Sequence, residues 1–298
     1  MGLFDSLSKN GIKNVSTSGM YAKTDTTIQM SGNEKFKDMY QDTPQFDEDS
    51  MILLKKYSCP VCDSDFQSPT VKTGKIRQVG IEKNLKPIFD FRFEPIKYEP
   101  ITCPKCGYSV MARFLTPLTS FQRKMFIESE DYSFVAPGGL NNKVVSYSLA
   151  VTKIKMSLVT AIIRKAKASE KAYICLKGYW LCESYLEALD RGEDDGSGKN
   201  PDEVRPEIQA DMEEFSQSAY DGFIEAMQSE RYPIAGMDEP TLDFLIAEMS
   251  VEREKYDVAS KLIASILGSN SASSRIKDKT RILKEEVLEA IRNKKNSQ

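Results

Sequence analysis

The spacing of hydrophobic and polar residues divides the chain into a short strand-forming part and a longer helical part. From residue 51, short runs are rich in β-branched and aromatic residues, some of them alternating with charged ones, which is typical of half-buried strands. Strands are predicted within 51–57, 71–81 and 89–93, and at Ile101. After residue 119, apolar residues recur every three or four positions, which is the period of an amphipathic helix. Helices are predicted over 121–130, 143–167, 170–189, 201–231, 241–253, 256–267 and 273–294.

This order of elements predicts an α+β fold that is mainly α. Residues 1–50 are expected to form an irregular N-terminal arm, residues 51–118 a small antiparallel domain, and residues 119–298 an antiparallel helical array. In the hairpin 241–267, small and apolar residues follow the pattern of a tetratricopeptide repeat: Ala247, Tyr256, Ala259 and Ile263. The match is partial, because Glu254 occupies a turn position where the repeat usually has Gly or Asn.

The N-terminal arm has no sustained apolar period after residue 7 and is rich in Ser, Thr, Asn, Lys and Asp. Its first apolar residues, Leu3, Phe4 and Leu7, are expected to rest on a neighbouring surface. Gly2 and Ser6 also satisfy the pattern for N-terminal myristoylation. Acylation by a eukaryotic enzyme is therefore an alternative use of this terminus.

Two Cys-x-x-Cys pairs carry the strongest chemical signal: Cys59 with Cys62, and Cys103 with Cys106. Four thiolates in a tetrahedron are the ligands that zinc prefers in a closed structural site. The four cysteines are therefore predicted to bind one zinc ion, which makes residues 51–118 a zinc ribbon. A domain of this size buries few apolar side chains, so metal binding, worth about 10–16 kcal/mol in small zinc domains, would decide whether it folds.

The residues beside these cysteines favour tight turns. Pro60 and Pro104 stiffen the two turns, and Gly107 lets the backbone leave the second turn at positive φ. A rubredoxin-like iron site uses the same two turns, so an iron redox centre is an alternative. No partner redox motif occurs in the rest of the sequence.

The segment 94–108, taken together with Cys59, Cys62 and Phe66, resembles a bacterial family of unknown function. That family combines an N-terminal double Cys-Pro-x-Cys ribbon with a helical, tetratricopeptide-like region. The resemblance covers residues 51–266, and the ribbon is its specific part. It implies a fold and a bound metal, and no established activity.

The remaining cysteines, Cys175 and Cys182, lie seven residues apart on one predicted helix. They share a helix face about 10 Å apart, which is too far for a disulfide between them. Apolar neighbours such as Leu176 and Trp180 predict two thiols of the core. A reactive or metal-bound pair is the alternative.

Charge is unevenly distributed along the chain. Residues 51–115 hold 11 basic and 6 acidic side chains, whereas residues 191–257 hold 6 basic and 19 acidic ones. A basic ribbon beside acidic helices predicts either docking of one part on the other or recruitment of a basic partner. If the ribbon instead binds nucleic acid, the residues expected to contact phosphates are Lys72, Lys75, Arg77 and Lys83. The whole-chain pI of about 5.4 argues against nucleic-acid binding as the main role.

An enzymatic function is not predicted, although the question stays open. The chain has no histidine, and four cysteine ligands leave no position for a reactive water on the metal. Asp194 and Asp195 lie in the glycine-rich loop 191–200, where nothing is expected to desolvate them and raise their pKa. The prediction is therefore a zinc-binding scaffold or adaptor that uses its helices to bind an unidentified protein partner.

Location in the cell is predicted from what the sequence lacks. The apolar stretch 149–163 is interrupted by Lys153 and Lys155, so no membrane span is expected. A secretory leader is not expected, because the N-terminus lacks a basic region followed by an apolar core and a small-residue cleavage site. The protein is therefore expected in the cytoplasm, where clustered thiols bind metal more often than they form disulfides.

Overall fold

Three separate antiparallel hairpins form the β-rich part of the chain. The computed structural model describes residues 2–17, 19–21, 47–89 and 92–296. The paired strands are β1 (Ile52–Ser58) with β2 (Asp65–Val71), β3 (Gln78–Ile81) with β4 (Pro87–Phe89), and β5 (Pro100–Thr102) with β6 (Ser109–Met111). Short 3₁₀ helices lie at Asp5–Asn10 (η1), Asp49–Met51 (η2), Pro95–Tyr98 (η3) and Ala112–Phe114 (η4).

The predicted strand over 71–81 is wrong as a single element. Residue 71 ends β2 and residues 78–81 form β3, while residues 72–77 turn between the two hairpins. The alternation over 89–93 places only Phe89 in a strand, and residues 90–91 lie outside the described part of the chain. The predicted strands do not include residues 65–70 of β2, residues 87–88 of β4 or any residue of β6.

In the described residues that follow, seven α-helices lie close to the positions that the apolar period predicts. They are α1 (Ser120–Ile127), α2 (Tyr147–Ile163), α3 (Ala168–Asp190), α4 (Pro201–Ser229), α5 (Glu239–Glu252), α6 (Tyr256–Gly268) and α7 (Ser274–Asn296). Helix α2 begins four residues later than expected because the Ser146 hydroxyl accepts a hydrogen bond from the Leu149 amide, which makes Ser146 the N-cap. None of the described helices is both long and apolar enough to cross a membrane.

The main hydrophobic core joins the N-terminal segment, the β-rich part, helices α2–α4 and one side of α5. Leu3, Phe4 and Leu7 are buried in it, as the sequence predicts. The amide of Leu3 donates a hydrogen bond of 2.7 Å to Glu214 on α4, which fixes this segment against the helices. Residues 22–46 of the expected arm lie outside the described residues.

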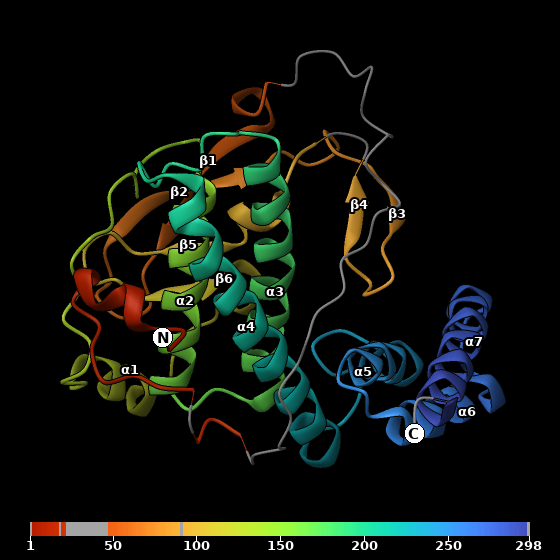
Figure 1. Ribbon diagram of the computed structural model, residues 1–298. Coiled ribbons are helices and arrows are strands. Elements are labelled where there is room, and N and C mark those ends of the chain that lie inside the picture. The colour runs from red at the N-terminus through yellow and green to blue at the C-terminus, as the bar shows by residue number, and fades with distance from the viewer. Residues whose placement is uncertain (1, 18, 22–46, 90–91, 297–298) are drawn as a thin grey trace.

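Helices α5–α7 form a second, smaller core, which is on the opposite side of the molecule from the N-terminal segment and next to the β3–β4 hairpin (Figure 1). Ala247 on α5 and Ala259 on α6 are both fully buried, as expected where two helices pack closely. Glu254, in the turn between them, adopts a positive φ of 52°, which explains why Gly or Asn suits this position. One such hairpin does not establish a tetratricopeptide array.

Candidate metal centre

The first cysteine pair lies in the turn between β1 and β2. The amide of Cys59 donates to the carbonyl of Ser64 (3.0 Å), and the amide of Asp63 donates back to the carbonyl of Cys59 (3.0 Å). Asp63 adopts a positive φ of 56° at the end of the turn, which an aspartate tolerates better than most residues. We call this turn, residues 59–64, the first knuckle.

The second knuckle, residues 103–108, repeats the same backbone pattern between β5 and β6. The amide of Cys103 donates to Tyr108 (2.9 Å), and the amide of Gly107 donates to Cys103 (2.9 Å). Gly107 has a φ of +76°, as the sequence predicts. A Cβ atom there would lie 2.3 Å from the Cδ2 atom of Phe134. Both the backbone conformation and the packing therefore require glycine.

The two knuckles bring all four predicted sulfur atoms together. The Sγ atoms of Cys59 and Cys106 are 3.6 Å apart, those of Cys62 and Cys103 are 3.7 Å apart, and all four lie within 4.8 Å of one another. These distances exceed a disulfide bond of about 2.05 Å. Tetrahedral metal–sulfur bonds of about 2.3 Å place neighbouring sulfurs about 3.8 Å apart, so the four cysteines can bind a metal ion.

Burial and hydrogen bonding shift the pKa values of Cys59, Cys103 and Cys106. Cys59 and Cys103 are buried, while Cys62 and Cys106 are half-buried. Hydrogen bonds from Cys106 and Cys59 lower the pKa of Cys103. The hydrogen bond between Cys106 and Cys103 raises the pKa of Cys106. Binding of a metal ion would therefore release the protons that the thiols share, and its affinity would rise with pH.

Aromatic residues from α1 and the following loop cover the knuckles. The ring of Tyr108 meets the ring of Phe126 edge to face at 5.5 Å, and Phe126 lies 4.8 Å from Tyr132. The Tyr132 hydroxyl donates a 2.5 Å hydrogen bond to the carbonyl of Gly107. This shell fixes the second knuckle through contacts from outside the metal-binding turn.

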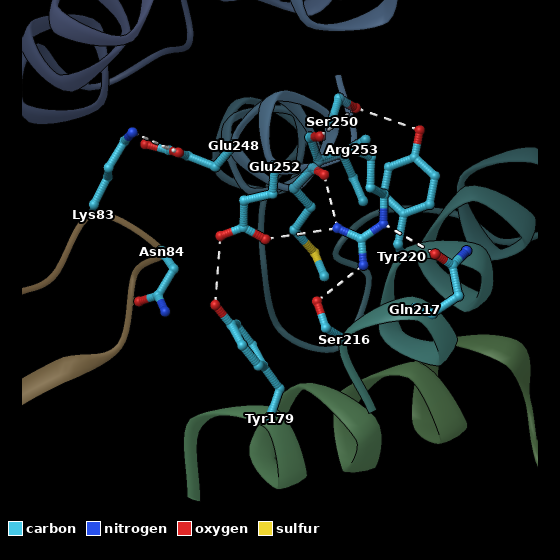
Figure 2. Close-up of polar contacts among 12 residues, drawn as sticks. Lys83, Asn84, Tyr179, Ser216, Gln217, Tyr220, Glu248, Ser250, Glu252 and Arg253 are labelled. Atoms are coloured by element: carbon cyan, nitrogen blue, oxygen red, sulfur yellow. Dashed lines mark hydrogen bonds and ion pairs between the residues drawn. The ribbon is translucent and has the colours of Figure 1, made fainter. Parts of the chain in front are cut away.

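A second group of polar residues lies where the β3–β4 loop meets α3, α5 and α7 (Figure 2). The Lys83 ammonium is 3.5 Å from the buried carboxylate of Glu248 and also pairs with Glu286. The side-chain amide of Asn84 donates to both carboxylate oxygens of Glu183, at 3.1 and 3.0 Å. Burial raises the pKa of Glu248 to about 8. No local pattern predicts this group, because its members are far apart in sequence.

Arg253 forms the adjoining half of the same network. Its guanidinium donates to the Ser216 hydroxyl (2.9 Å), the Gln217 side-chain carbonyl (3.2 Å) and the Met249 main-chain carbonyl (2.7 Å). It also lies 4.8 Å from the ring of Tyr220 (Figure 2). Arg253 thus joins the end of α5 to α4. These hydrogen bonds indicate that Arg253 has a structural role.

Cys175 and Cys182 lie where the sequence predicts, whereas Asp195 does not. Cys175 and Cys182 are fully buried, as predicted for thiols of the core, and burial raises the pKa of each. Asp195 is not solvated as expected: it is buried and accepts hydrogen bonds from the Tyr185 hydroxyl and the Ser197 amide. Burial acts to raise its pKa, but these hydrogen bonds outweigh burial and lower it.

Two of the four residues predicted to contact phosphates, Lys72 and Lys83, bind other groups of the protein. Besides the ion pairs of Lys83, the Lys72 ammonium donates a 2.6 Å hydrogen bond to the carbonyl of Ser50. Lys75 and Arg77 lie in the turn between β2 and β3. The four side chains therefore do not form one uncommitted basic face.

Comparison with known proteins places the chain in a family. No curated protein and no solved structure matches it. A family model described as "Uncharacterized protein conserved in bacteria (DUF2225)" matches residues 52–287, which begin at the first residue of β1, end within α7 and include all four clustered cysteines. The chain belongs to this bacterial family.

Proposed function

We propose that the protein is a zinc-stabilised scaffold that binds a protein partner. The arrangement of four sulfur atoms from two matching knuckles carries this proposal. Zinc is the metal we assign, because a closed set of four thiolates is its usual structural site. A rubredoxin-like iron centre remains the chemical rival.

The proposed metal ion is structural because four cysteine ligands fill a tetrahedral ion and leave no position for substrate or water. It would tie the β1–β2 hairpin to the β5–β6 hairpin. The latter packs against α2, so the metal would also hold the β-rich part on the helices. Its effect is to fix a surface rather than to carry out a reaction.

The helices supply the proposed partner-binding surface. Ile282 on α7 is 64% exposed, although most apolar residues of that helix face the second core. Leu288, on the same helix, is also exposed. Single exposed apolar residues are common on protein surfaces, so exposure alone does not identify a contact surface, and α7 enters the proposal as the surface to be tested.

Elemental analysis of the purified full chain tests the metal. We expect one zinc per chain in the wild type and in Cys175→Ser, a control that removes a thiol outside the knuckles. Cys103→Ser should lose the zinc. Zinc retained at full stoichiometry in Cys103→Ser, or iron as the native metal, would contradict the proposal.

Affinity capture from nuclease-treated lysate tests the scaffold role. Wild-type bait should retain a protein that Ile282→Ala loses and Lys284→Ala keeps, since both variants truncate an exposed side chain of α7. Capture that disappears with nuclease treatment, or that falls steeply with salt, would favour the nucleic-acid alternative.

A further inference from the structure

Among the residues that the structure describes, strand β1 has one paired edge and one open edge. It pairs with β2 in antiparallel register from Ile52 opposite Val71 to Ser58 opposite Asp65. Backbone bonds from Lys72 to Met51 (2.8 Å) and from Cys59 to Ser64 (3.0 Å) flank this register. Hydrogen-bonded pairs alternate with non-bonded pairs in an antiparallel ladder, so residues 53, 55 and 57 bond to β2.

The backbone groups of Leu54 and Lys56 consequently point away from β2. Within the described residues, the sheet that contains β1 has only these two strands. The N–H and C=O groups on this edge are therefore available to a further strand. A row of unpaired backbone groups is a template for adding a strand from another chain.

The other edge of the hairpin is protected in a way that β1 is not. Pro69 on β2 lies opposite Leu54 at a non-bonded position, where backbone groups point away from β1. The outer edge of β2 therefore lacks an N–H donor at residue 69. A proline there prevents β2 from accepting another strand. Strand β1 contains no proline, which leaves its edge as the one where a partner can pair.

The side chains of β1 indicate what such a partner contains. Leu53 and Leu54 are 38% and 43% exposed, and Lys55 and Lys56, which follow them, are exposed as well. Each face of the strand therefore presents a leucine followed, two residues later, by a lysine. An antiparallel partner is complementary when two acidic residues precede two apolar ones, because unlike charges opposite each other stabilise a strand pair.

We infer that β1 is a docking edge for an extended segment of a partner protein with the pattern acidic-acidic-apolar-apolar, added antiparallel as a third strand. A second copy of β1 fits less well, because this strand has no acidic residue to place opposite either lysine. The inference goes beyond the proposed function, since it depends neither on the identity of the metal nor on α7. It names a partner chemistry and a surface.

Fluorescence polarisation with labelled decapeptides tests this assignment on the full chain. The probe carries the central sequence Glu-Glu-Val-Val, and two control peptides carry Lys-Lys-Val-Val and the reversed order Val-Val-Glu-Glu. The wild type should bind the probe saturably and at least about tenfold more tightly than either control.

Two variants separate backbone pairing from charge. Leu54→Pro removes an N–H that does not bond to β2, so the hairpin should fold with unchanged zinc content while probe binding is lost. The double variant Lys55→Glu/Lys56→Glu should lose the Glu-Glu probe and gain the Lys-Lys peptide. Failure of the wild type to bind the probe, or equal binding of all three peptides, would overturn the inference. A wild-type dimer in sedimentation that Leu54→Pro dissociates would also overturn it, because the edge would then serve a second copy.

Discussion

Replacing Gly107 with alanine tests the packing of the second knuckle most directly. Gly107 has a φ of +76°, and a left-handed backbone destabilises a residue with a Cβ by about 1–2 kcal/mol. The new Cβ would also lie 2.3 Å from Cδ2 and 2.4 Å from Cγ of Phe134. Overpacking of this kind adds about 1–3 kcal/mol, so we expect a total loss of unfolding free energy of roughly 2–5 kcal/mol.

Gly74 provides a matched control. It has the same φ of +76°, but a Cβ there would meet no atom within 4 Å. Gly74→Ala should therefore lose only the backbone contribution of about 1–2 kcal/mol. The difference between the two variants measures the contact between the knuckle and Phe134.

Urea unfolding at a fixed concentration of free zinc is the assay, because bound metal shifts apparent stability by mass action. Adding Phe134→Ala to Gly107→Ala should recover part of the loss, since the smaller side chain makes room for the new Cβ. Equal losses in the two glycine variants would refute the reasoning. Absence of coupling between residues 107 and 134 would refute it as well.

Three further predictions concern the rest of the chain. Cys175 and Cys182 should resist a thiol reagent in the native protein and react after denaturation, because both are fully buried; rapid native labelling would contradict their structural role. Burial raises the pKa of Glu248 from 4.5 to about 8, so the folded state holds a proton that the unfolded chain releases, and stability falls as pH rises between those values. In urea unfolding, Glu248→Gln should reduce the change of unfolding free energy with pH. A pH dependence equal to that of the wild type would show that Glu248 does not cause it. Chelation should lower helical circular dichroism as well as disorder the knuckles, because strands that flank the knuckles share the main core with the helices through Ile52 of β1 and Met111 of β6; unchanged helicity would show that the two parts fold independently.

The sequence predicts the helices well because all have an apolar period and most also have a capping signal; α3 and α6 lack a side-chain cap. Helix α4 begins at Pro201, after Asn200 whose side chain accepts a hydrogen bond from the Asp202 amide. Helix α5 follows Asp238, which caps it through the amide of Thr241. These signals lie within a few residues of the helix end, so they are independent of the tertiary contacts that the helix makes.

Short strands are predicted less well because tertiary contacts decide them. Strands β5 and β6 have three residues each, all buried, so they show no alternation of apolar and polar residues. Strand β2 contains Pro69 and polar residues that disfavour a strand. Its pairing with β1 is favoured by the knuckle between them.

The candidate site is predictable in composition but not in detail. Cysteine spacing alone identifies all four sulfurs, because two ligands from one tight turn must lie close together in the sequence. Spacing does not reveal that Cys59 lies close to Cys106, or that Phe134 closes over Gly107. Those contacts depend on how separate hairpins and loops meet.

A small part of the charge difference between the two parts of the chain is balanced by contacts within the protein. Lys83, in the basic part, pairs with Glu248 and Glu286 on helices of the second core. Leu85, in the same loop, packs against both hydrophobic cores. The β3–β4 loop therefore contacts both groups of helices, and the charge of Lys83 is already paired with Glu286 there. A lysine in such an ion pair is not available to a partner protein. Exposed lysines such as Lys55 and Lys56 on β1 are therefore the better candidates for a binding surface.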